Sequence, residues 1–339
     1  MRTFPTAHAP HRPHARSVRT VMWLVCAALV PGTLAQALFF GAGVVVQVLL
    51  AVAFALAVEA LCLRLRGVPL QPFLGDGSAV VTAWLFALCL PPLAPWWIAA
   101  AGMLAALGLG KHAFGGLGHN PFNPAMVGYA LVLLGWPLDL ARWPPARGAG
   151  EVPGLADALR TIFTGTADAG WDALTRATPL AVQHDLAAAG RTLAEIRADV
   201  AWTTAGAPAW GWIAAAFALG GIALCLLRIV DWRTPAAVLL GVLVLALPPW
   251  LFDSGVHPPP LQHLASGGLV LCAFFIASDP VSGAGTPRGR WLFGIGVAAL
   301  VLALRAWGRF PDGIAFAILA MNALAPLIDR HTVPRVFGR

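Results

Sequence analysis

Charged residues are scarce in this chain of 339 residues. They make up 11% of the sequence, whereas 59% of the residues are hydrophobic, and a soluble domain carries about 25% charged residues. This composition excludes an ordinary soluble domain and predicts a polytopic membrane protein whose main solvent is the bilayer. Lysine is almost absent as well, since Lys111 is the single one and the net charge of +7 comes from arginine.

The positions of the arginines and cysteines exclude two further classes of protein. The arginines flank apolar runs and form no single basic patch, so we expect topology signals and no nucleic-acid binding. None of the cysteines has a partner in a C-x-x-C pattern, which predicts buried thiols and no metal or iron–sulfur site formed by this chain alone. The five cysteines, all in apolar runs, are Cys26, Cys62, Cys89, Cys225 and Cys272.

Ten apolar segments predict an all-α polytopic membrane protein. Residues 78–90 and 124–136 are shorter than the roughly 20 residues of a full crossing and are bounded by glycine and proline, which indicates half-helices or broken helices. Such elements need protein or a cavity around them, because lipid cannot satisfy their backbone. The segments are residues 20–40, 43–63, 78–90, 94–110, 124–136, 208–227, 235–252, 263–277, 291–307 and 311–328.

The short loops carry a strong charge asymmetry. If the ten segments alternate sides, fourteen basic residues fall on the side of the N-terminus, and only Arg305 and Arg309 fall on the other. Cytoplasmic loops are enriched in arginine and lysine, so we expect both termini in the cytoplasm. The long loop 137–207 then lies outside, in the periplasm if the cell has an outer membrane, and its own arginines count little, because long loops cross largely regardless of charge.

The two halves share a faint pattern at an offset close to 190 residues. The stretch NPFNP (120–124) opens the last segment of the first half, as FPDG (310–313) opens that of the second. Five segments per half is an odd number, so we expect two inverted five-segment repeats. The predicted parts are a disordered cytoplasmic tail (1–19), a first membrane repeat (20–136), the long extracytoplasmic loop (137–207), a second membrane repeat (208–329) and a cytoplasmic tail (330–339).

Three acidic residues are candidates for ion coupling. Glu59 lies well inside an apolar segment, and intramembrane acids are functional candidates by default. Asp76 and Asp279 lie at the ends of apolar segments, where helix capping and turn formation are the competing interpretation. The sequence leaves both interpretations open.

The stretch KHAFGGLGHNPFNP, residues 111–124, is the most distinctive one in the chain. Its glycines free the backbone and its prolines fix it, while Asn120 and Asn123 can cap or bridge exposed amides. It lacks the G-x-x-x-x-G-K-[ST] pattern and a preceding strand, so it does not predict a P-loop. It forms either a rigid loop before a half-helix or a gate or cofactor wall.

Four stretches together resemble one family. In chain order they are GDGSAVVTAWLFALCLPPLAPWW, KHAFGGLGHNPFNPAMVGYA, the string D-x-x-T-x-A-T over residues 172–178, and FFIASDPVSGAGTPRGRWLFG. This order resembles the membrane-bound D subunit of the Rnf electron-transport complex, and the related B subunit of the sodium-pumping NADH:quinone oxidoreductase has similar motifs. The resemblance covers residues 65–330, and the short N-terminal tail favours the Rnf family.

The resemblance implies a flavoprotein. In that family a threonine of the extracytoplasmic loop carries FMN through a phosphoester bond, which a flavin transferase makes on the string D-x-x-[ST]-G-A-T. Matched residue by residue, Thr178 carries the FMN, and Asp172, Thr175 and Ala177 belong to the recognition string. Arg176 replaces the usual glycine, and its side chain either blocks the transferase or lies against the flavin phosphate. A second, noncovalent flavin such as riboflavin stays an open question.

The resemblance also implies one relay station between NADH and ferredoxin, where electron flow is coupled to the movement of H+ or Na+. The expected partners are the other Rnf subunits (A, B, C, E and G), the flavin transferase and membrane lipid, and the chain is not expected to be catalytic alone. Three alternatives stay open: the B subunit of the sodium pump, a urea-channel-like solute transporter without flavin, and a scaffold protein that lost its flavin because of Arg176.

Overall fold

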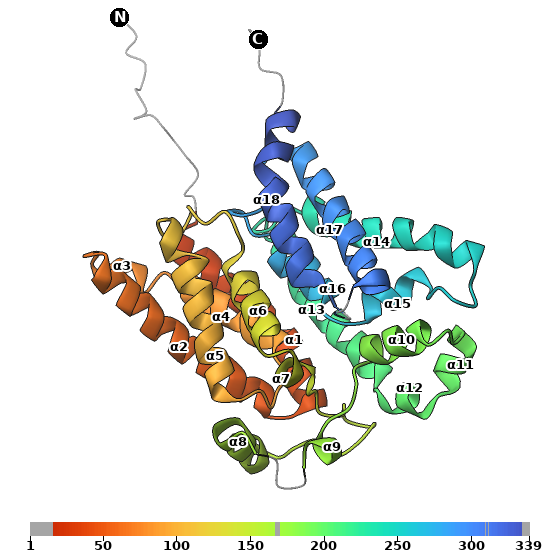
Figure 1. Ribbon diagram of the computed structural model, residues 1–339. Coiled ribbons are helices and arrows are strands. Elements are labelled where there is room, and N and C mark those ends of the chain that lie inside the picture. Colours follow the sequence, from red (N-terminus) through yellow and green to blue (C-terminus); the bar gives the residue numbers. More distant parts are fainter. Residues whose placement is uncertain (1–15, 167–169, 309, 311, 334–339) are drawn as a thin grey trace, which may run out of the picture.

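The computed structural model describes residues 16–166, 170–308, 310 and 312–333. Over these residues the fold is all-helical, with no β-strand beyond two isolated bridges (Figure 1). Seven of the described helices are long and apolar enough to cross a membrane, and two shorter apolar helices accompany them. The predicted fold class, an all-α polytopic membrane protein, is confirmed. The disorder predicted for residues 1–19 falls mostly outside the described residues.

The first half contains both short helices that the sequence predicts. α4 and α6 have 12 residues each, too few for a crossing of about 20 residues. α4 begins after Gly77, whose φ of 83° suits glycine, and α6 begins with Pro124 after the N-cap Asn123. The elements are α1 (Val18–Phe40), α2 (Gly43–Leu65), α3 (Leu70–Phe73), α4 (Ser78–Cys89), α5 (Trp96–Met103), the π-helix η1 (Leu104–Leu109), the 3-10 turn η2 (His112–Phe114) and α6 (Pro124–Gly135).

The second half follows the same order but breaks its third segment. We predicted one helix over 263–277, and the structure divides it at Gly267, whose φ of 66° interrupts the helix. The elements are α13 (Ala207–Leu226), α14 (Arg233–Phe252), α15 (Pro260–Ala265), α16 (Leu269–Leu271), the π-helix η3 (Cys272–Ile276), α17 (Pro287–Trp307) and α18 (Ile314–Thr332).

The first helices of the two halves pack side by side and run in opposite directions. Arg16, just before α1, donates a hydrogen bond to the carbonyl of Leu227, just after α13 (2.8 Å). Phe40, at the far end of α1, packs against Trp210 near the start of α13, with ring centroids 5.3 Å apart. Antiparallel counterparts are what inverted repeats require. The repeat boundaries at 20–136 and 208–329 stay a prediction.

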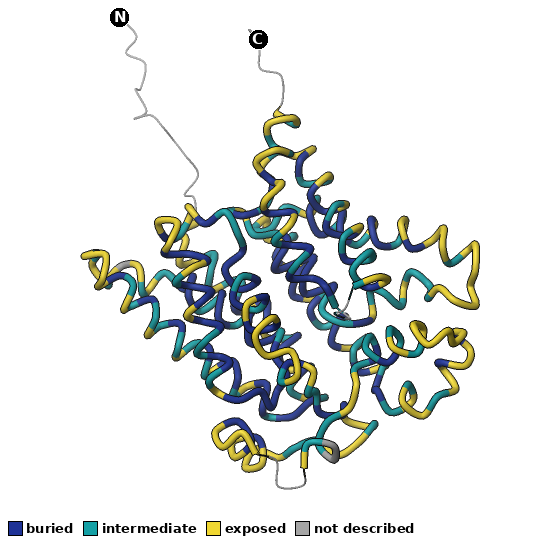
Figure 2. Tube along the Cα trace, viewed as in Figure 1, coloured by how far each residue is buried: buried dark blue, intermediate teal, exposed yellow. Residues whose placement is uncertain are grey.

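The loop 137–207 folds into short helices at one end of the body. In Figure 1 most of them lie opposite the end where the chain enters α1 and leaves α18, and Figure 2 shows many of their residues exposed. They are α7 (Pro137–Ala141), α8 (Leu155–Thr164), α9 (Trp171–Leu174), α10 (Pro179–Ala188), α11 (Leu193–Ala198) and α12 (Val200–Thr204). This arrangement agrees with the charge asymmetry of the short loops.

Glycines allow α1 and α13 to approach closely. A Cβ atom on Gly220 would lie 1.9 Å from the carbonyl oxygen of Ala28, and one on Gly32 would lie 2.1 Å from the ring of Phe217. Helices in lipid associate through close packing of small residues, because lipid tails are as apolar as the side chains. These contacts therefore hold the two halves together.

We expect Gly220→Ala to lower the thermal unfolding midpoint of the detergent-solubilised protein, because its methyl group would press on the α1 backbone. Overpacking of this kind costs about 1–3 kcal/mol. Gly108→Ala is the matched control, since a Cβ there meets no atom within 4 Å. Equal midpoints for the two variants would show that the α1–α13 contact is looser than described.

Candidate functional site

Thr178 is the N-cap of α10. Its hydroxyl oxygen accepts a hydrogen bond from the backbone N–H of Ala181 (3.3 Å), and Pro179 occupies the first helical position. The side chain is half-buried. A helix N-terminus presents unpaired N–H groups and the positive end of the helix dipole, both of which favour an anion. A phosphate linked to Thr178 would lie in such an environment.

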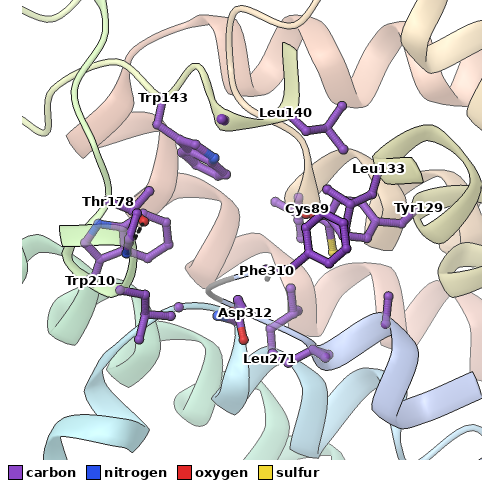
Figure 3. Close-up of a pocket in the computed structure, with 18 of the residues that line it drawn as sticks. Cys89, Tyr129, Leu133, Leu140, Trp143, Thr178, Trp210, Leu271, Phe310 and Asp312 are labelled. Carbon is purple, nitrogen blue, oxygen red and sulfur yellow. Dashed lines mark hydrogen bonds between the residues drawn. The ribbon is translucent and has the colours of Figure 1, made fainter. Parts of the chain in front are cut away.

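Thr178 lies at the edge of a cavity of about 210 Å³ between the two halves (Figure 3). Trp143 and Trp210 lie on the same side of this cavity as Thr178, and Tyr129 and Phe310 lie on the other side. The lining comes from the long loop, from α4 and α6, and from the breaks of the second half. A largely apolar cavity with a few polar groups is typical of cofactor sites.

An aromatic cluster fixes the wall beside Thr178. Phe40, Trp143 and Trp210 contact one another with ring centroids between 5.2 and 5.5 Å apart. The backbone N–H of Arg176 donates to the carbonyl of Trp143 (2.8 Å). The string around Thr178 is thereby tied to the aromatic wall through the main chain.

Asp312 supplies the charged group of the cavity. One carboxylate oxygen accepts from the backbone N–H of Gly268 (2.8 Å), and the other accepts from the Arg305 guanidinium (3.1 Å). Arg305 also donates to the carbonyls of His263 and Ser266, and its side chain is 4% exposed. The pair therefore supplies hydrogen-bond partners to backbone N–H and C=O groups that have no helical partner at the break before α16.

The other residues of the string are arranged locally. Thr175 is the C-cap of α9, and its hydroxyl donates a hydrogen bond to the carbonyl of Trp171 (2.8 Å). Arg176 is exposed, and its guanidinium donates to the carbonyl of Thr175 (2.8 Å). Ala177 is exposed as well. The side chain of Asp172 lies outside the described part of the structure, so its role in the string stays a prediction.

Asp76 and Asp279 accept hydrogen bonds from nearby backbone N–H groups, and Glu59 forms a buried ion pair. Asp76 accepts from the backbone N–H of Ser78 (2.7 Å) at the start of α4. Asp279 accepts from the N–H of Val281 (3.0 Å) and from the Ser282 hydroxyl (2.8 Å). Glu59, by contrast, is 2% exposed and pairs with Lys111. That partner, 52 residues away in the chain, had no signal in the local sequence.

The two asparagines belong to the loop before α6. Asn120 donates to the carbonyl of Phe122 (3.1 Å), within its own loop. Asn123 caps α6 by accepting from the N–H of Met126 (3.2 Å), and its own N–H donates to the side chain of Asn322 in α18 (3.0 Å). The stretch is a hydrogen-bonded loop before α6 that also lines a second cavity, so both the rigid loop and the cofactor wall stay predictions.

The second cavity, of about 130 Å³, lies nearer the chain ends, because its lining includes Met22 at the start of α1. It repeats the first cavity at a fixed sequence offset. Pairs of lining positions, one from each cavity, are 190 residues apart: Ser78 and Gly268, Val81 and Leu271, Pro124 and Ile314, Ala125 and Ala315, Leu88 and Ser278, and Cys89 and Asp279. The two cavities are therefore counterparts in the two halves.

Sequence reasoning missed the walls of the Thr178 cavity. Trp143 and Trp210 flank the two ends of the long loop, but nothing in their spacing predicts that they meet. Tyr129 was a usable signal, because it is the single tyrosine of the chain. Arg305 was another, since it lies in an otherwise apolar segment.

Comparison with known proteins identifies relatives over the whole chain. The family model described as "NQR2, RnfD, RnfE family" matches residues 5–338. Three similar proteins are each named as the D subunit of an ion-translocating oxidoreductase complex. One from Vibrio cholerae serotype O1 (strain M66-2) is 41% identical over 345 residues, covering 99% of both chains. One from Aeromonas hydrophila is 42% identical over 345 residues with the same coverage.

The third, from Escherichia fergusonii, is 40% identical over 347 residues, covering 99% of this chain and 98% of the relative. Both the family model and these relatives extend over the two membrane halves and the loop between them. The chain therefore belongs to the NQR2, RnfD, RnfE family.

Proposed function

We propose that this chain is the membrane-bound D subunit of an Rnf-type ion-translocating oxidoreductase complex and that it carries FMN covalently on Thr178. The observation that supports this most is the position of Thr178, which combines a helix N-terminus with the edge of an aromatic-walled cavity between the two halves. The names of the relatives support membership of such a complex and the place of this chain in it.

The residues around Thr178 fit the chemistry of FMN. The N-terminus of α10 suits the phosphate, and Trp143 and Trp210 offer apolar surfaces to the flavin ring. FMN, when bound, supplies transfer of one or two electrons, so it can join carriers of both kinds. The chain contributes position and exclusion of water, and the Arg305–Asp312 pair contributes a fixed charge arrangement in the cavity wall.

The wider role follows from the family. We propose that the chain relays electrons between NADH and ferredoxin, coupled to transport of H+ or Na+, together with the A, B, C, E and G subunits and after modification by a flavin transferase. The second cavity is the proposed place for a noncovalent flavin such as riboflavin, because it is the counterpart of the first. A urea-channel-like transporter needs neither the string nor the aromatic wall, and the B subunit of the sodium pump fits less well than the D subunits found among the relatives.

Covalent flavin is tested by in-gel fluorescence of the fully denatured chain, expressed with its host's flavin transferase. We expect a fluorescent band for the natural sequence and a dark band for Thr178→Ala, because the phosphoester needs the hydroxyl. Thr192→Ala is the matched control, since Thr192 is also a threonine N-cap in this loop. A dark natural chain beside an active transferase would support the scaffold or channel alternative.

Arg176, which stands where the family's string has glycine, gives a second test. We expect Arg176→Gly to leave the final flavin content unchanged, because the Arg176 side chain is exposed and its tie to Trp143 uses the main chain. Flavin content is read from absorbance per mole of purified protein. A flavin content that rises strongly in the glycine variant would mean that Arg176 obstructs the transferase.

The proposed location is the bacterial inner membrane with both termini in the cytoplasm. We expect alkaline phosphatase fused behind the C-terminus to be inactive and the same enzyme fused after Gly190 to be active, because the basic short loops stay inside. Active phosphatase at the C-terminus, with an inactive fusion at Gly190, would invert this topology.

A further inference from the structure

A buried cluster of ionisable side chains lies between α2 and the loop after η1. The Nζ atom of Lys111 is 2.8 Å from Oε1 of Glu59, and Nε2 of His112 is 2.9 Å from Oε2 of the same carboxylate. The side chains of Glu59, Lys111 and His112 are at most 5% exposed. Among the described residues, two other ionisable groups lie near this cluster. Arg66 is linked to Glu59 through His112, and Cys62 lies on the next turn of α2.

The hydrogen bonds assign the protons of this cluster. Nδ1 of His112 lies 3.1 Å from Nη1 of Arg66, and a guanidinium can only donate. Nδ1 must therefore accept, so the imidazole is neutral with its proton on Nε2, which donates to Glu59. The other oxygen of this carboxylate accepts from the Lys111 ammonium in an ion pair. Arg66 is exposed and also donates to the carbonyl of Gly115 (2.9 Å), so the cluster connects to the surface through His112.

The cluster leads to the second cavity at its other end. Nζ of Lys111 also donates to the Ser78 hydroxyl (2.9 Å), and both residues line that cavity, whereas Glu59 does not. Lys111 therefore lies between the carboxylate and the cavity. A continuous series of hydrogen bonds runs from exposed Arg66 through His112, Glu59 and Lys111 to Ser78.

The geometry selects a proton over a metal cation. Both oxygens of Glu59 are already occupied by nitrogen donors at 2.8 and 2.9 Å. A sodium ion needs several oxygen ligands, whereas Lys111 would face it as a like charge. A proton needs no added space, because it passes along hydrogen bonds that already exist.

The buried ion pair of the second half cannot transfer a proton in this way. There the buried cation is Arg305, which pairs with Asp312 beside the first cavity. A guanidinium stays protonated in proteins, whereas a buried lysine can lose its proton. The fold therefore places a fixed charge beside the Thr178 cavity and a titratable one beside its counterpart.

We infer that Glu59, Lys111 and His112 form a proton-transfer site between the protein surface at Arg66 and the second cavity. A proton enters on Nδ1 of His112 when Arg66 turns away, and the Nε2 proton moves to Glu59. Lys111, now without its counter-ion, releases a proton past Ser78 into the cavity, and Glu59 then returns its proton to Lys111. One proton enters and one leaves. The imidazole, left with its proton on Nδ1, then turns over so that a protonated nitrogen again faces Glu59 and an unprotonated one faces Arg66. This inference rests on the proposed function, because an ion-translocating complex gives the transfer its use.

Lys111→Arg is the sharpest test, because arginine keeps the charge and a donor toward Glu59 but does not release a proton. The whole complex, reconstituted in vesicles with an internal pH-sensitive dye, is compared with the natural protein. We expect the variant to assemble with normal flavin fluorescence and to move protons about 100-fold more slowly, the scale of general acid–base catalysis. Normal proton movement in this variant would overturn the inference.

The double variant Glu59→Gln/Lys111→Met separates transfer from folding. Removing one partner of a buried pair costs about 3–5 kcal/mol, whereas replacing both is often tolerated, so we expect assembly with the same loss of proton movement. Asp231→Asn/Arg290→Gln, which removes a part-exposed pair outside the cluster, is the control and should move protons normally.

Full proton movement in the double variant would show that the pair is structural, and movement of Na+ without H+ by the natural complex would also refute the inference. Failure of the proposed function is read separately. If the natural chain gives a dark band in the fluorescence gel while proton movement still depends on Lys111, the proposal of covalent flavin on Thr178 fails and the inferred proton-transfer site stands.

Discussion

Lipid offers no hydrogen-bond partner to a backbone, and this constraint shapes the whole chain. α4 and α6 are too short to cross, and the third segment of the second half is broken, so other helices must enclose them. α2, α5 and α18 pack around the two short helices. At each of these helix starts a side-chain oxygen accepts a hydrogen bond from a backbone N–H group. The side chains are Asp76 at α4, Asn123 at α6, and Asp312 at the break before α16.

The same breaks produce the two cavities. Helices that stop inside the membrane leave room beyond their ends, and the pseudo-symmetry of the two halves places one cavity toward each side. The loop between the halves then brings Thr178, Trp143 and Trp210 to one of them. The other receives Lys111 and Ser78. Side chains that do not correspond between the two halves thus give one cavity the Arg305–Asp312 pair and an attachment residue, and the other the Lys111–Glu59 pair.

The sequence predicted what is encoded locally. The starts of α4 and α6 follow from Gly77, Asn123 and Pro124, and the helix bounds follow from hydropathy. The break at Gly267 was missed, because a glycine inside an apolar run is often tolerated in a helix. The partners Glu59 and Lys111, and the meeting of Trp143 with Trp210, could not be predicted, since contacts between distant segments depend on how whole helices pack. Thr178 itself came from the family resemblance, and its N-cap geometry fits the local pattern of a hydroxyl before proline.

The central claim is that a flavin linked to Thr178 occupies the cavity between the two halves. An experimental density map of the complex, purified from its native membrane, tests this most directly. We predict density continuous with the Thr178 hydroxyl, a phosphate at the N-terminus of α10, and a planar ring between the walls of Trp143 and Phe310. A bare Thr178 side chain, with the cavity collapsed or filled by a lipid tail, would contradict it.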